Sequence, residues 1–130
     1  MSTKEVPFLS PMRPYSFPVD ESVQPHRSLS SVLIPPDKSL SHRAVMFNSL
    51  ADGNAKISNF LMGEDCLSTI SVLRELGVKI EVSSDSVITY GKGINSLSEP
   101  NKILDVGNSG TTIRLMSGIL AGRNFECTLD

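Results

Sequence analysis

One strand-to-helix turn organises the first half of this sequence: residues 35–43 read PPDKSLSHR. The mostly apolar residues 31–34 before it are typical of a short strand, which the two prolines close. Residues 39–51 after it have helical spacing and predict a helix. The residues expected on the buried face of that helix are Leu40, Ala44, Phe47, Leu50 and Ala51.

A second turn of the same kind lies further along, where residues 104–114 read LDVGNSGTTIR. A strand is expected over 102–106, a helix over 109–120 and a further strand over 124–129. The residues of this helix expected to point inward are Ile113, Met116 and Leu120.

Between the two turns, strands and helices alternate. Residues 55–61 predict a strand, and residues 65–76 predict a helix that Asp65 caps. Residues 78–82 alternate between apolar and charged, and residues 87–90 return as the second strand of a hairpin. Glycines are expected to end the helices, in Asp52-Gly53-Asn54, at Gly77 and at Gly122. The middle helix is expected to bury Leu67, Ile70, Leu73 and Leu76.

The order of these elements predicts the fold class. It is strand-helix-strand-helix-strand-strand, followed by strand-helix-strand, so the second run resembles the start of the first. We predict an α/β (α+β) fold of repeated βαβαββ units over residues 27–130, with one unit and the start of a second. Because the second unit is incomplete, we expect either a fragment of a longer enzyme or a remnant that stops early. Residues 1–26 hold five prolines and no apolar periodicity, which predicts a disordered extension.

Composition excludes several classes of protein. The sequence is 39% hydrophobic and 20% charged with a formal net charge of -2, so nothing favours nucleic acid or an acidic membrane surface as a partner. No apolar run spans a bilayer and no secretory signal precedes the fold, so a cytoplasmic location is expected. Cys66 and Cys127 are expected to be reduced thiols. With only His26 and His42 beside them, no metal site is predicted.

The first turn has the chemistry of an anion site. A helix N-terminus favours anions through its unpaired N–H groups and its dipole. Lys38 adds a mobile charge and Ser39 a hydroxyl, and Arg43 lies four residues beyond Ser39 on the same face. On residue types alone, an equally good interpretation is that Ser39 and Ser41 only cap the helix while the two cations are solvated.

The second turn brings more polar groups to a helix start. Gly107 and Gly110 allow close backbone approach, and Asn108, Ser109, Thr111 and Thr112 surround them. The spacing fits neither the P-loop nor the dinucleotide-binding fingerprint. Asp105 is expected to order the turn through hydrogen bonds, and Arg114 to brace it. Two such turns in one small domain predict a ligand set with two anionic groups.

Both turns, in their order and separation, resemble the signatures of the 5-enolpyruvylshikimate-3-phosphate synthase family. The first resemblance is carried by residues 37–44, DKSLSHRA, and the second by residues 107–115, GNSGTTIRL. The second signature reads Asn-Ser-Gly-Thr-Thr rather than Asn-Ala-Gly-Thr-Ala, and Leu115 stands where the other branch has proline. In these respects it is similar to the branch with reduced glyphosate sensitivity.

The resemblance implies an activity. The family transfers enolpyruvyl from phosphoenolpyruvate to the 5-hydroxyl of shikimate 3-phosphate and releases phosphate, with no metal or cofactor. It also implies a two-domain fold of repeated βαβαββ units with the substrates between the domains. By position, Lys38 would contact both substrates, and Ser39 and Arg43 would bind shikimate 3-phosphate. The residues implied at the phosphoenolpyruvate site are Asn108, Gly110 and Thr111.

Two departures qualify the resemblance. Pro36 stands where the family usually has glycine, which fixes φ and removes an N–H group beside the turn. The family's acid and base carboxylates lie in its later part, so no catalytic residue is assigned here. We therefore expect the 130-residue chain to need that later part, to bind weakly and to turn over negligibly.

Two alternative functions stay open. One is a non-catalytic remnant or anion-binding module. The other is a fragment of the related transferase acting on UDP-N-acetylglucosamine, whose early motif has Lys-Asn where this sequence has Lys38-Ser39.

Overall fold

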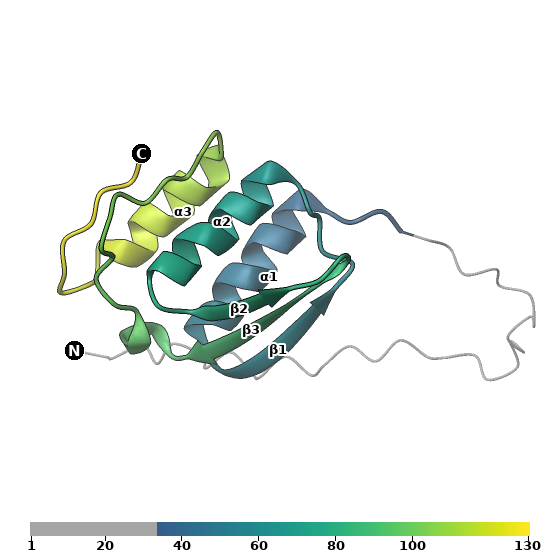
Figure 1. Cartoon of the computed structure of the whole chain (residues 1–130), viewed down its shortest axis with the longest axis horizontal. Coiled ribbons are helices and arrows are strands. Elements are labelled where there is room, and N and C mark those ends of the chain that lie inside the picture. The colour runs from purple at the N-terminus through teal and green to yellow at the C-terminus, as the bar shows by residue number, and fades with distance from the viewer. Residues whose placement is uncertain (1–33) are drawn as a thin grey trace, which may run out of the picture. The chain divides into compact units, whose positions relative to one another are not determined.

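The computed structural model describes residues 34–130, in which helices pack on one face of a three-stranded sheet (Figure 1). The alternation of helices and strands confirms the predicted α/β class. The predicted extension over 1–26 and all but the last residue of the predicted strand over 31–34 lie outside the described residues. The elements are α1 (Lys38–Leu50), β1 (Asp52–Ser58), α2 (Glu64–Glu75), β2 (Lys79–Val82), β3 (Ser86–Lys92), the 3-10 helix η1 (Ile94–Ser96) and α3 (Gly110–Leu120).

The sheet has the strand order β1-β3-β2, and both pairings are antiparallel. The predicted hairpin is confirmed, with Val82 opposite Val87 and a tight turn between β2 and β3. β1 runs along the whole of β3, from Asp52 opposite Lys92 to Ser58 opposite Ser86. This pairing draws Asp52-Gly53-Asn54 into the strand, so these residues do not cap the first helix as predicted, and α1 ends at Leu50 with Ala51 as its C-cap. A strand does follow the helix, but it covers Asp52–Ser58 rather than the predicted 55–61.

The helix starts differ from the predicted ones because other residues cap them. α1 begins at Lys38, and its N-cap is Asp37, whose Oδ1 accepts a hydrogen bond from Leu40 N at 2.7 Å. α2 begins at Glu64 after the N-cap Gly63, which leaves Asp65 inside the first turn rather than at the cap. The end of α2 is as predicted: Gly77 has φ +91, and its N–H donates to Arg74 O at 2.9 Å.

α1 buries a different face from the predicted one. Leu40 and Phe47 are 60% and 66% exposed, whereas Val45 and Met46 are buried. Sequence periodicity counts apolar residues only, but the buried face of α1 also includes polar side chains. Ser41 and His42 are hydrogen-bonded there, whereas the buried Ser49 hydroxyl has no partner among the described residues. Leu67 and Ile113 are likewise more exposed than predicted. The buried residues of α1 are Ser41, His42, Val45, Met46 and Ser49.

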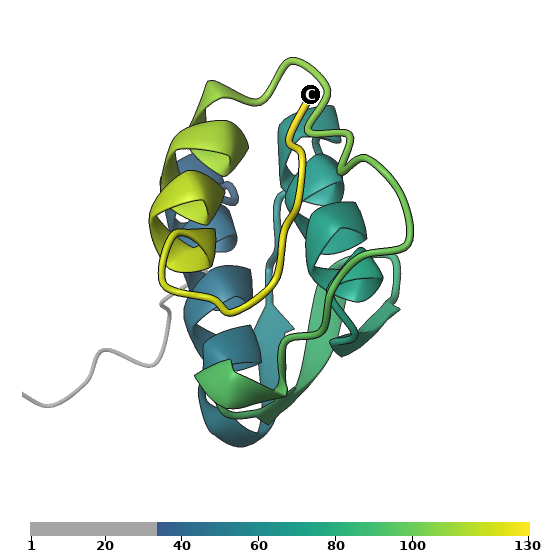
Figure 2. The same cartoon turned by 90° about the vertical axis from the view of Figure 1, so that its left-hand side faces the viewer.

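The two predicted strands near the end of the chain are reduced to a single bridge. Leu104 pairs in parallel with Leu129, and Figure 2 shows the last segment running beside the segment before α3. Leu104 N donates to Thr128 O at 2.8 Å, and Asp130 N donates to Leu104 O at 3.0 Å. Within residues 34–130, no third strand lies beside these two segments, and their pairing does not extend into a ladder of several residues. The pairing still has the strand-helix-strand connection expected for the start of a second unit.

Among the described residues, no helix has the length and apolar character to cross a membrane. Nor do three or more side chains that could hold a metal ion gather anywhere in this part of the chain. Cys66 is a buried free thiol, and burial raises the pKa of the Cys66 thiol above its ordinary value.

The close approach of β3 to the end of α1 gives a first test. An alanine side chain at Gly91 would overlap the backbone carbonyl oxygens of Ala51 and Asn48. We expect Gly91→Ala to lower the free energy of unfolding by about 1–3 kcal/mol, measured by urea denaturation. The control is Gly118→Ala in α3, where the new side chain meets nothing within 4 Å and a gain of about 0.5–1 kcal/mol is expected. Equal effects at the two sites would contradict this packing.

Candidate anion-binding site

All three helices begin at the same end of the unit, at the upper right in Figure 1. Each helix start has unpaired backbone N–H groups and the positive end of a helix dipole. The first predicted turn leads into α1 and the second into α3, with α2 between them. The fold therefore places both predicted anion turns at one end.

The first turn presents two of its predicted residues to solvent. Ser39 and Arg43 are exposed on α1, and Arg43 Nε donates to Ser39 O at 3.2 Å. The guanidinium thus lies back along the helix toward its start. Ser41, offered as a possible cap, is instead buried: its hydroxyl donates to Asp37 O at 2.8 Å and accepts from Leu61 N at 3.0 Å.

Lys38 is held by an ion pair. Its Nζ contacts Asp65 Oδ2 in the first turn of α2, with the two side chains 54% and 26% exposed. The hydrogen bond to Asp65 raises the pKa of Lys38 above its ordinary value. The amine therefore stays protonated, and it lies between the starts of α1 and α2.

The second turn is ordered by its own side chains. Asp105 Oδ1 accepts from Gly107 N at 2.7 Å, which confirms the expected role of Asp105. Gly107 has φ +56, and Ser109 then caps α3 by accepting from Thr112 N at 3.2 Å.

Arg114 was expected to brace this turn, but it is exposed and makes no hydrogen bond or ion pair to residues 34–130. The predicted ligand-facing residues Asn108, Gly110 and Thr111 are all exposed.

A buried chain of side chains joins the two turns. His42 Nδ1 lies 2.8 Å from Thr69 Oγ1, and Thr69 Oγ1 lies 2.6 Å from Thr112 Oγ1. Thr112 Oγ1 in turn donates to Ser109 Oγ at 2.6 Å. These four side chains, which we call the hydroxyl relay, come from α1, α2 and α3 and the cap of α3. Each is at most 1% exposed.

The charge state of His42 follows from this setting. Burial lowers the pKa of His42 below its ordinary value, and the nearby Lys38 ammonium lowers it further, while Asp65 opposes the change. His42 Nε2 is buried and has no hydrogen-bond partner among the described residues. The imidazole is therefore neutral near pH 7.

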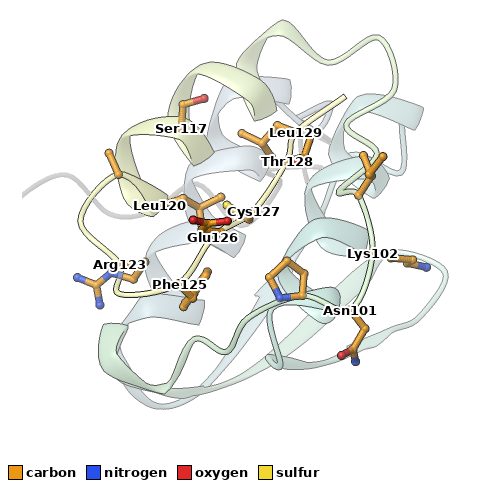
Figure 3. Close-up of a pocket in the computed structure, with 13 residues that line it drawn as sticks. Asn101, Lys102, Ser117, Leu120, Arg123, Phe125, Glu126, Cys127, Thr128 and Leu129 are labelled. Atoms are coloured by element: carbon orange, nitrogen blue, oxygen red, sulfur yellow. The ribbon is translucent and has the colours of Figure 1, made fainter.

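A large pocket of the described residues lies elsewhere. It is open, has a volume of about 710 Å³, and lies between the C-terminal end of α3 and the segments 100–103 and 123–129 (Figure 3). None of the predicted ligand-binding residues lines it.

Sequence reasoning missed the contribution of α2. Asp65 pairs with Lys38, and Thr69, one helical turn later on the same helix face, holds the centre of the hydroxyl relay. The signal in the sequence was the Thr69 hydroxyl on the otherwise apolar buried face of α2. A buried hydroxyl needs a hydrogen-bond partner, so this residue indicated a polar contact with another element.

Comparison with known proteins points to one family. Residues 23–130 match the model of the family described as EPSP synthase (3-phosphoshikimate 1-carboxyvinyltransferase). The chain is 63% identical over 99 residues to the 3-phosphoshikimate 1-carboxyvinyltransferase of Bacillus cytotoxicus, covering 76% of this chain and 23% of that protein. It is 64% identical over 92 residues to the Bacillus subtilis protein of the same name, covering 71% of this chain and 22% of that protein.

A solved structure agrees with these sequence matches. EPSP synthase from Acinetobacter baumannii superposes with a TM-score of 0.72 at 41% identity, covering 75% of this chain and 22% of that chain. The chain spans about a quarter of the length of the curated relatives that it matches.

The setting of His42 predicts a pH dependence. Its folded pKa lies below the ordinary value of 6.5, so the unfolded chain binds the proton more readily. The stability that neutral His42 contributes is fully present above about pH 6.5 and is lost as the pH falls from there through the folded pKa. With only two histidines in the sequence, NMR titration of the ring protons can follow each one.

We expect the His42 resonance to titrate below 6.5 in the folded chain and near 6.5 in concentrated urea. A folded midpoint at or above the urea value would contradict the buried, neutral imidazole.

Proposed function

Since this chain belongs to the EPSP synthase family, we propose that the shared N-terminal end of α1, α2 and α3 forms part of an enolpyruvyl transferase site. The observation that supports this most directly is the joining of two anion turns by the buried hydroxyl relay. A transferase for phosphoenolpyruvate and shikimate 3-phosphate needs two neighbouring anion sites, because each substrate carries a phosphate. A cytoplasmic location goes with this proposal, since both substrates are small soluble metabolites.

The first turn takes shikimate 3-phosphate. Arg43 offers a planar fork of donors to a phosphate, and the exposed Ser39 hydroxyl lies one helical turn away on the same face. Lys38, at the start of α1 and beside α2, contacts both substrates from its place between the helix starts.

The second turn takes phosphoenolpyruvate. The exposed Asn108 and Thr111 offer an amide and a hydroxyl at the start of α3. A side chain added at Gly110 would meet nothing within 4 Å, so the space beside this residue is open to a ligand. The anion then lies against the N-terminal end of α3, where the helix dipole favours negative charge.

The reaction proceeds by addition and elimination. The 5-hydroxyl group of shikimate 3-phosphate loses its proton to a base as its oxygen bonds to C2 of phosphoenolpyruvate, while an acid gives a proton to C3, which yields a tetrahedral intermediate. Loss of a proton from C3 and cleavage of the bond from C2 to the phosphate oxygen then release phosphate and the enolpyruvyl product. The residues assigned here bind and orient both substrates, and Lys38 neutralises phosphate charge. The proton transfers need the later part of the enzyme, so negligible turnover is expected of this chain by itself.

Titration of the 130-residue chain with shikimate 3-phosphate tests the first turn. We expect weak, saturable binding with a Kd on the order of millimolar, followed by NMR at the amides of the first turn of α1. Arg43→Ala should weaken that binding about tenfold or more, because charge-assisted hydrogen bonds to the phosphate are lost. Lys56→Ala removes an exposed cation from β1 and serves as the matched control. If the folded chain shows no saturable binding, or if both variants behave alike, the assignment fails.

Gly110→Ala tests the second turn. The added methyl group meets no protein atom, so the thermal midpoint should not fall. The affinity for phosphoenolpyruvate, titrated in the presence of shikimate 3-phosphate, should drop several-fold because the methyl group fills ligand space. Equal weakening of both ligands would place Gly110 outside the phosphoenolpyruvate site.

A further inference from the structure

The hydroxyl relay has its centre at a residue outside both signature turns. Thr69 lies on α2 and is fully buried. Its hydroxyl oxygen is within hydrogen-bond distance of His42 on α1 and Thr112 on α3. A third contact, to the Asp65 carbonyl oxygen within α2, is longer at 3.3 Å. Among the described residues, Thr69 is thus the only one whose hydroxyl bonds to both α1 and α3, the two helices that follow the anion turns.

The hydrogen bonds of the relay run in one direction. The Thr112 hydroxyl donates to Ser109 Oγ, so its oxygen must accept from Thr69. The single hydroxyl hydrogen of Thr69 therefore points to Thr112 Oγ1 at 2.6 Å and not to the more distant Asp65 carbonyl oxygen at 3.3 Å. Thr69 Oγ1 must then accept from His42 Nδ1. This assigns the neutral His42 tautomer with its hydrogen on Nδ1. The unpartnered His42 Nε2 is then a lone pair rather than an orphaned N–H donor.

The relay ends at the residue that starts α3. Ser109 Oγ accepts from the Thr112 hydroxyl and from Thr112 N, which makes it the N-cap of α3. The residues assigned to phosphoenolpyruvate lie on either side of it, at Asn108, Gly110 and Thr111. The position of the second anion turn therefore depends on a hydrogen-bond chain that begins on α1. The cap of α1 differs in this respect, because Asp37 accepts from Leu40 N and has no hydrogen bond to the relay.

We propose that Thr69 is a positioning residue, whose hydroxyl fixes the second anion turn relative to the first. The part that concerns ligands rests on the proposed function, while the part that concerns the turn itself does not. Valine has nearly the shape of threonine but no hydroxyl, so Thr69→Val removes the link between α1 and α3 while keeping the packing. It leaves His42 Nδ1 without an acceptor and Thr112 Oγ1 without a donor.

The first measurement needs no ligand. In Thr69→Val, amide hydrogen exchange at the first turn of α3 should be at least about fivefold faster, while the first turn of α1 keeps its protection. The ¹⁵N shifts of His42 should also move away from the Nδ1–H pattern. Thr69→Ser keeps the hydroxyl and should restore both signals.

The chain offers a matched control for the loss of a threonine hydroxyl. Thr89 on β3 is also fully buried, and its hydroxyl has no hydrogen-bond partner among the described residues. Thr89→Val should therefore leave α3 exchange and the His42 shifts unchanged. If Thr69→Val fails to fold, Thr112→Val breaks the next link and should speed α3 exchange while the His42 shifts persist.

The second measurement uses phosphoenolpyruvate with shikimate 3-phosphate present. Thr69→Val should weaken phosphoenolpyruvate binding roughly threefold to thirtyfold and leave shikimate 3-phosphate binding within about twofold. Unchanged exchange at α3 in Thr69→Val, or equal behaviour of the valine and serine variants, would overturn the positioning role. If exchange responds as expected but wild type binds neither ligand, the positioning role stands and the proposed function fails.

Discussion

Hydrogen bonding among buried hydroxyl groups determines how the three helices lie against one another. An apolar contact tolerates small shifts, but a buried hydroxyl without a partner costs free energy, and its partners must lie at a fixed distance and direction. Ser41 ties the start of α1 to the segment before α2, and Thr69 ties α2 to α1 and α3. The alignment of the helix starts, and with it the candidate site, follows from these bonds.

Most of the fold could be predicted from sequence because it depends on local signals. The β2–β3 hairpin shows alternating side chains, and Gly77 ends α2 in the left-handed conformation that glycine favours. The buried face of α1 could not be predicted in this way. Its apolar stripe through Leu40 and Phe47 is real, but the fold buries a neighbouring stripe that includes Ser41 and His42. That choice depends on tertiary hydrogen bonds and on the space that Gly91 leaves below α1.

The candidate site was predictable in its parts but not in its connections. Both turns show in the sequence because glycines, hydroxyls and cations gather at helix starts. The role of α2 does not show, because Asp65 and Thr69 act on residues far away along the chain. The hydroxyls at Ser109 and Thr112 were visible in the second signature, but the bond from Thr112 to Thr69 became visible only with the fold.

The ion pair between Lys38 and Asp65 has a consequence for selectivity. Before any ligand arrives, the cation between the starts of α1 and α2 already has a carboxylate partner. An anion that binds there must share that cation or displace the carboxylate, so the contact is an exchange of one counter-charge for another. A monovalent ion such as chloride carries no more charge than the carboxylate, so replacing the carboxylate with it gains little binding free energy. A doubly charged phosphate attracts the Lys38 ammonium more strongly than the carboxylate does. Asp65 therefore favours the binding of doubly charged anions over singly charged ones.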